Sequence, residues 1–97
     1  MIQTITPLDN TIYVERDYNS KIIEETLSNS VIAQNEWSKL AVKERVVLLQ
    51  NFVSDFLSKE SQIIEEITRQ MGRPISQAIS ELKGFKERAD YMLSIAE

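Results

Sequence analysis

The 97-residue sequence contains neither cysteine nor histidine, and this double absence removes many reaction mechanisms. The chain can form no disulfide, no thiolate nucleophile and no Ser-His or Cys-His pair, and it lacks the side chains of the usual zinc sites. Only two glycines occur, Gly72 and Gly84, so no glycine-rich loop can place backbone N–H groups against a phosphate. We therefore expect no catalytic residue, no cofactor-binding residue and no cofactor bound by this chain.

Basic charge and long apolar runs are also scarce. The chain has 11 basic and 15 acidic residues and a net charge of −4, and its basic residues form no stripe that would neutralise a nucleic-acid backbone. No apolar run approaches the roughly 20 residues needed to cross a bilayer. The first ten residues also lack the basic and apolar regions of a signal peptide. These features predict a cytoplasmic chain with no nucleic-acid partner and no membrane association.

The composition that remains, 42% apolar and 27% charged residues, is typical of a soluble globular protein. Near the N-terminus, β-favouring residues flank the turn Pro7-Leu8-Asp9-Asn10, in which Pro7 presets φ and Asn10 tolerates a left-handed conformation. Residues 1–18 are therefore predicted to form a β-hairpin. Two strands alone are marginal in water, so the hairpin must lie against another part of the protein.

The remaining residues, 19–97, carry the patterns of four helices. Helix-capping residues, apolar periodicity and the Gly72–Pro74 stop signal set the limits. The first expected helix begins at Asn19 or Ser20 and includes Trp37, and the second runs from about Val42 to Leu57. The third runs from about Lys59 to Gly72, and the fourth from Ile75 to Glu97. The predicted fold class is mainly α, a short hairpin followed by a four-helix bundle. Trp37 is expected to pack under this bundle, on the side of the first helix that carries Ile22 and Ala33.

The last helix has two sets of aligned residues. Its main apolar stripe repeats at spacings of three and four, as a core face does, and consists of Ile75, Ala78, Leu82, Phe85, Ala89, Met92 and Ala96. Away from this stripe, Gly84, Arg88, Tyr91 and Ile95 also line up at spacings of four, three and four. This second stripe is either ordinary surface, because single exposed apolar residues are normal, or a face that other protein covers. No Gly, Asn or Pro follows Glu97 to close the helix, and we expect an interrupted chain.

Taken in order, several segments resemble the N-terminal region of the aldehyde dehydrogenase superfamily. The segments are TPLDNTIY, AQNEW, Glu44 with Arg45, RQMGRP and ADYMLSIAE. Asn10 stands where members usually have Gly, and Arg73 replaces a frequent Lys. Gln70 occupies the place of a frequent acid that, in some members, joins backbone carbonyls like those of Thr4 and Ile5 around a monovalent cation. Thr4, Ile5 and Gln70 are therefore only weak candidates for a cation site, because the neutral amide of Gln70 is a poorer ligand than a carboxylate.

The resemblance implies an NAD(P)-dependent enzyme that converts aldehydes to carboxylic acids. The chain then corresponds to the first part of a larger α/β, Rossmann-like cofactor domain, with the catalytic thiol, the general base and the NAD or NADP contacts downstream of Glu97. In the family, the helix resembling Ile75–Glu97 borders the substrate entrance, which makes Gly84, Arg88, Tyr91 and Ile95 candidate entrance residues. Arg88 is either a residue that attracts acidic substrates or a solvated surface residue.

Two functions follow from these expectations. The first is an N-terminal fragment of an aldehyde dehydrogenase, inactive alone and serving as scaffold and entrance wall, whose partner is the remainder of the parent enzyme. The second is a free-standing helical interaction module that binds a partner helix or forms a homo-oligomer. Periodicity does not separate the two.

Overall fold

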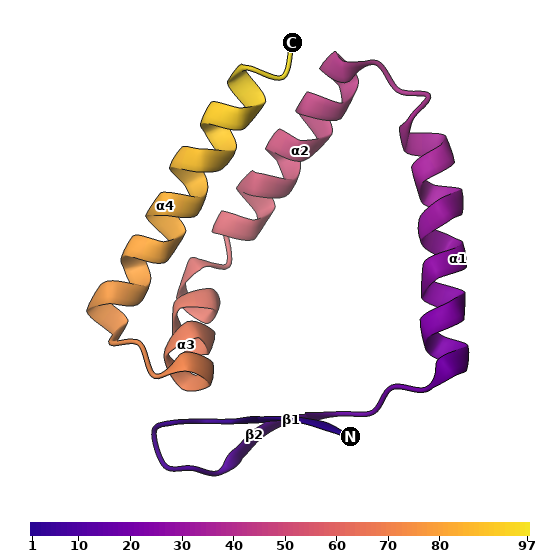
Figure 1. Ribbon diagram of the computed structural model, residues 1–97. Helices are drawn as coiled ribbons and strands as arrows, with labels where there is room; N and C mark the ends of the chain where they lie inside the picture. Colours follow the sequence, from indigo (N-terminus) through magenta and orange to yellow (C-terminus); the bar gives the residue numbers. More distant parts are fainter.

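The structure, a computed structural model, describes residues 1–97 and consists of an antiparallel hairpin followed by four helices (Figure 1). The mainly α fold class predicted from the sequence is confirmed. No helix is both long enough and apolar enough to cross a bilayer. The elements are β1 (Ile2–Ile5), β2 (Ile12–Arg16), α1 (Ser20–Trp37), α2 (Val42–Leu57), α3 (Glu60–Met71) and α4 (Ile75–Ser94).

The hairpin turn is built as its residue types predict. Asn10 adopts the left-handed conformation at φ 62°, which Asn tolerates better than most residues. Asp9 stabilises the turn because its Oδ1 accepts hydrogen bonds from the backbone N–H and the hydroxyl of Thr11, at 3.0 and 2.7 Å. The register of the two strands becomes irregular between Thr4 and Ile5.

Local signals also set most of the helix limits. The side chain of Asn19 caps α1 by accepting a hydrogen bond from the backbone N–H of Ile22 at 2.9 Å. The carboxylate of Glu44 accepts one from the backbone N–H of Ala41 at 2.9 Å, at the start of α2. Gly72 ends α3 in the left-handed conformation at φ 74°, and its N–H donates to the carbonyl of Thr68 at 2.8 Å.

The end of α4 differs from the prediction. The helix stops at Ser94 instead of continuing to Glu97, because Ile95 leaves the helical conformation at φ −103° and ψ 2°. In the last turn the carbonyl of Tyr91 accepts hydrogen bonds from the backbone N–H of Ile95 at 3.2 Å and from the hydroxyl of Ser94 at 2.6 Å.

Only α2, α3 and α4 pack together. Val53 of α2 and Ala78 and Leu82 of α4 are the buried apolar residues, which makes the core small. Phe56 of α2 and Phe85 of α4 extend it, with their ring centroids 4.9 Å apart. Four of the seven residues of the predicted α4 stripe are thus buried or half-buried, whereas Ile75, Met92 and Ala96 at its two ends stay exposed.

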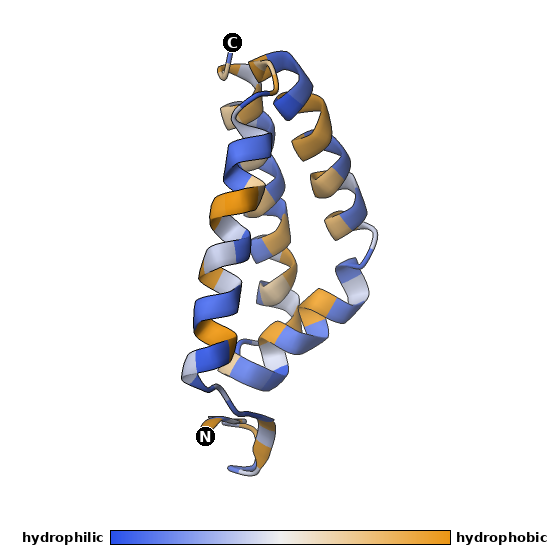
Figure 2. Cartoon of the chain, turned by 90° about the vertical axis from the view of Figure 1, so that its right-hand side faces the viewer, coloured by the Kyte–Doolittle hydropathy of each residue, from blue (hydrophilic) through white to orange (hydrophobic).

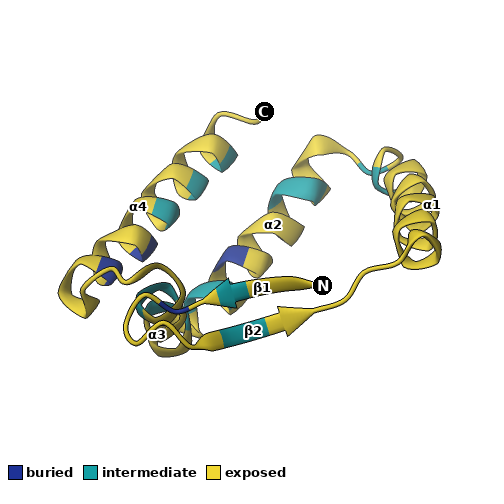
Figure 3. Cartoon of the chain, turned by 60° about the horizontal axis from the view of Figure 1, so that its bottom comes forward, coloured by how far each residue is buried: buried dark blue, intermediate teal, exposed yellow.

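Helix α1 stands apart from this core, so the four helices do not form a closed bundle (Figures 1 and 3). The structure has a radius of gyration of 17.3 Å, against about 12.5 Å for a compact domain of this length. The connection from α1 to α2 is short and hydrogen-bonded back to the end of α1: the N–H groups of Ser38, Lys39 and Leu40 donate to carbonyls of that helix. It directs α1 away from the core.

Trp37 is the only residue of α1 that is not fully exposed. It is half-buried and, together with Val46, Leu49 and Leu93, lines a hollow beside the N-terminal half of α2 and the C-terminal end of α4. Ile22 and Ala33, which were predicted to be buried with Trp37, are exposed. Trp37 therefore anchors the C-terminal end of α1, and the rest of the helix extends away from this anchor.

Candidate functional site

The second stripe of the last helix lies on an open surface. Gly84, Arg88, Tyr91 and Ile95, which we call the α4 outer stripe, are all exposed. No side chain fills the space next to Gly84, because a Cβ built there would meet no atom within 4 Å. Tyr91 and Ile95 are 63% and 56% exposed, and Ile95 lies one residue beyond the end of the helix. The chain itself therefore leaves this stripe uncovered.

Arg88 is the one charged member of the α4 outer stripe, and it forms no ion pair within the chain. Elsewhere on α4, Lys86 contacts Asp90, and Glu81 contacts Arg73. The guanidinium group of Arg88 consequently keeps all of its hydrogen-bond donors available to a ligand or to another protein surface.

The three candidate cation ligands lie near the hairpin and on α3. Thr4 is half-buried in β1 opposite Val14, and Ile5 is 54% exposed. The amide nitrogen of Gln70 donates a hydrogen bond to Oε2 of Glu66 at 2.8 Å. The structure contains no group of three or more acidic side chains that could hold a metal ion. What these candidates offer is backbone carbonyls and one amide.

A polar link between the hairpin and α3 was not found from the sequence. The hydroxyl of Tyr13 in β2 donates to Oε1 of Glu66 at 2.8 Å. The hydrogen bonds from Gln70 and Tyr13 stabilise the carboxylate and lower the pKa of Glu66. The bond to Glu66 also raises the pKa of Tyr13, since the carboxylate holds the phenol proton. Tyr13 and Glu66 are 53 residues apart, and no local pattern connects them.

The Pro7 turn makes a second contact between the hairpin and α3. A Cβ built on Gly72 would lie only 2.7 Å from Cγ of Pro7, so the ring of Pro7 lies close against Gly72. The structure thus gives Gly72 two roles: it ends α3 in a conformation that glycine favours, and it leaves room for the hairpin. The sequence indicated only the first.

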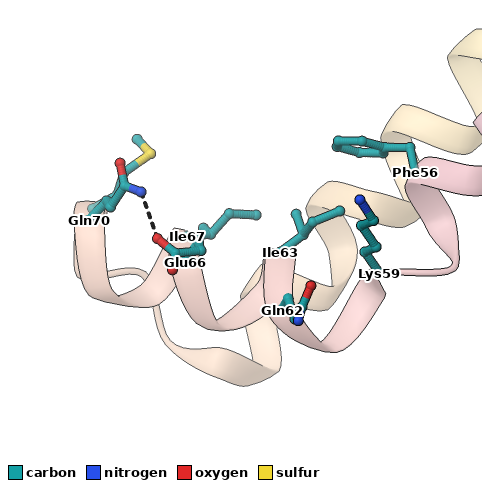
Figure 4. A pocket seen from close by; sticks show the side chains of 8 residues that line it. Phe56, Lys59, Gln62, Ile63, Glu66, Ile67 and Gln70 are labelled. Carbon is teal, nitrogen blue, oxygen red and sulfur yellow. Dashed lines mark hydrogen bonds between the residues drawn. The ribbon is translucent and has the colours of Figure 1, made fainter. Parts of the chain in front are cut away.

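Two shallow hollows flank α3. One, of about 380 Å³, is lined by the apolar residues Phe56, Ile63, Ile67 and Met71 and by the polar residues Lys59, Gln62, Glu66 and Gln70 (Figure 4). The other, of about 500 Å³, is lined by Leu8, Ser61, Ile64, Glu65, Thr68, Arg69, Ile75 and Ile79. In the first hollow the carboxylate of Glu66 accepts a hydrogen bond from Gln70 at 2.8 Å, and in the second Arg69 pairs with Glu65 at 2.9 Å. These surfaces are suited to contact with protein or ligand and not to covalent chemistry.

Comparison with known proteins gives one match. The sequence model of the aldehyde dehydrogenase family matches residues 1–97, which is the whole chain. No curated protein and no solved structure matches the chain.

Proposed function

Since this chain belongs to the aldehyde dehydrogenase family, we propose that it forms the N-terminal part of the cofactor domain of an enzyme that oxidises aldehydes with NAD or NADP. Residues 1–18 and 19–97 are then the hairpin and the helical segment of that domain. In this proposal the chain is a scaffold and not itself catalytic, because a chain without Cys and His lacks the thiol that the family uses as its nucleophile. Other parts of the enzyme supply the thiol, the general base and the cofactor contacts.

The observation that carries this proposal is the amount of apolar surface that the chain leaves open. Domains are built from packed layers around one core, yet only three apolar residues are buried here. Large apolar residues are exposed on every helix, among them Leu27 on α1, Phe52 on α2, Met71 on α3 and Tyr91 on α4. Surface of this kind supports a role as one layer of a larger protein.

Within the proposed enzyme, the α4 outer stripe is a wall of the substrate entrance. Its exposure is compatible with this role, since none of its residues is used by the chain's own core. Gly84 leaves space at the mouth, Tyr91 and Ile95 give an apolar surface, and Arg88 gives a positive charge that would attract aldehydes carrying an anionic group.

The test compares two charge reversals on α4 in an enzyme that carries this chain as its N-terminal part. We expect Arg88→Glu to raise KM for an aldehyde with a carboxylate group and to leave KM for a neutral aldehyde unchanged. Lys83→Glu is the matched control, because Lys83 is also an exposed base on α4 but lies outside the stripe. Equal effects of the two variants, or equal effects on both substrates, would contradict an entrance role for Arg88.

The alternative function, a free-standing interaction module, is favoured by one observation: α1 exposes apolar residues along its length and is held to the other helices only at its end, by Trp37. The coding sequence beyond Glu97 separates the two functions. A reading frame that continues into glycine-rich and cysteine-containing sequence supports the enzyme, and a stop codon supports the module.

A further inference from the structure

Arg45 is a charged residue on an apolar side of α2. Val42 and Leu49 lie three residues before it and four residues after it, and such positions share one side of a helix. Arg45 is half-buried, whereas its neighbours Lys43 and Glu44 are exposed. Of the two bases in α2, only Arg45 is therefore held among apolar side chains.

Arg45 lines the hollow into which Trp37 packs, and we call this the Trp37 hollow. It has a volume of about 300 Å³ and lies at the end of the molecule opposite the hairpin (Figures 1 and 2). Apart from Arg45, all of its lining residues are hydrophobic: Trp37, Val42, Val46, Leu49, Leu93 and Ala96. Arg45 is thus the only charged residue in an otherwise apolar hollow.

The guanidinium group of Arg45 lacks a partner within the chain. Its Nε atom is buried and has no hydrogen-bond partner. The two acids closest to Arg45 in the sequence are engaged elsewhere. Glu36 pairs with Lys39 at 2.9 Å, and the carboxylate of Glu44 accepts a hydrogen bond from the N–H of Ala41 at 2.9 Å. Buried donors in folded proteins are nearly always hydrogen-bonded, so this Nε needs an acceptor that residues 1–97 do not supply.

The chemistry of the hollow indicates what kind of acceptor fits. The guanidinium group carries a permanent positive charge, and a charge held among apolar side chains is stabilised by an opposite charge. Nε and one terminal nitrogen of Arg45 also form a planar fork that matches the two oxygens of a carboxylate. A backbone carbonyl offers only one oxygen and no charge. An acidic side chain is therefore the acceptor that satisfies both the charge and the geometry.

We propose that an Asp or Glu side chain from outside residues 1–97 enters the Trp37 hollow and pairs with Arg45 through Nε and one terminal nitrogen. This inference rests on the proposed function, in which the remainder of an aldehyde dehydrogenase packs against this chain. The apolar lining of the hollow keeps water from the pair, so it is stronger than an exposed ion pair. Arg45 then fixes the position of the scaffold on the remainder of the enzyme and is not a catalytic residue.

The first experiment measures unfolding of an enzyme that carries this chain as its N-terminal part. Arg45→Met removes the charge and keeps an unbranched apolar side chain, and it leaves the partner carboxylate unpaired. Lys43→Met is the matched control, because it makes the same change at an exposed base of α2. We expect a lower urea midpoint for Arg45→Met and an unchanged midpoint for Lys43→Met. Equal midpoints for the two variants would overturn the proposal.

Cross-linking identifies the partner residue directly. In the Arg45→Lys enzyme, a water-soluble carbodiimide should join the introduced amine to the carboxylate in contact with it, forming an amide bond. Peptide mapping by mass spectrometry should place this acid outside residues 1–97, and the native amine of Lys43 should not be joined to the same acid. The absence of a product would overturn the proposal. So would a product with Glu97, which follows Ala96 in the sequence.

Labelling of the unaltered enzyme keeps the proposal testable should the Arg45 variants fail to fold. Phenylglyoxal modifies accessible guanidinium groups, and Arg88, which is exposed on α4, is the reference. We expect Arg45 to react more slowly than Arg88, and equal rates would overturn the proposal. The proposed function fails separately, if the reading frame stops at Glu97. A continuing frame whose enzyme gives no cross-linked product refutes only the Arg45 pair.

Discussion

Replacing Gly72 with Ala tests how the hairpin is held on the helices. Two costs add. The left-handed conformation at φ 74° costs a non-glycine residue about 1–2 kcal/mol. The new Cβ would also lie 2.7 Å from Cγ of Pro7, whose ring cannot rotate away, and overpacking of this kind costs about 1–3 kcal/mol. We expect a loss of about 3 kcal/mol in the free energy of unfolding, measured by urea denaturation at one fixed chain concentration.

A double-mutant cycle separates the two costs. Pro7→Ala removes Cγ, and the nearest remaining atom of residue 7 is then the Cβ, 3.4 Å from the added methyl group. In this background Gly72→Ala should lose only the conformational cost, so the coupling free energy between the two sites is expected to be about 1–3 kcal/mol. Strictly additive effects would show that Pro7 does not contact Gly72 in solution and would refute the docking of the hairpin on α3.

Three further predictions follow from the described contacts. Trp37→Ala should lower the free energy of unfolding, measured by urea denaturation, by about 2 kcal/mol, roughly half the value for a fully buried Trp, because Trp37 is half-buried. Unchanged stability would show that Trp37 does not pack against α2 and α4. The pKa of Glu66 is lowered from 4.5, so its stabilising effect is present above about pH 4.5 and is lost as the pH falls through the lower pKa of the folded state. Glu66→Gln should weaken this acid dependence, and an identical pH profile would contradict it. The purified chain should neither reduce NAD(P) in the presence of aldehydes nor hydrolyse activated esters, and turnover that persists through repurification would contradict the scaffold role.

The sequence predicted the elements well because local chemistry determines where they begin and end. Asn19 caps α1 and Gly72 ends α3 in the way that their residue types indicate. The predicted end of α4 was less accurate, because the helix stops at Ser94 without a residue such as Gly72, which marks the end of α3. The four residues of the α4 outer stripe are each exposed, and their role at a substrate entrance stays a prediction.

Long-range features were not predictable in the same way. Amphipathic periodicity shows that α1 has an apolar side, but it does not show which surface covers that side, and a closed bundle was the simplest expectation. The Tyr13–Glu66 hydrogen bond joins residues 53 positions apart, and the fit of Pro7 against Gly72 depends on where the hairpin lies. Features of this kind depend on the folded arrangement and not on any local pattern.

Complementation is the most direct test of the central claim, that this chain is a non-catalytic scaffold of an aldehyde dehydrogenase. The chain would be coexpressed with an aldehyde dehydrogenase lacking the matching N-terminal segment, and aldehyde-dependent NAD(P)H formation would be measured for each part alone and for the two together. We predict activity only when both parts are present. Activity of the chain alone, or equal activity of the shortened enzyme with and without the chain, would contradict the claim.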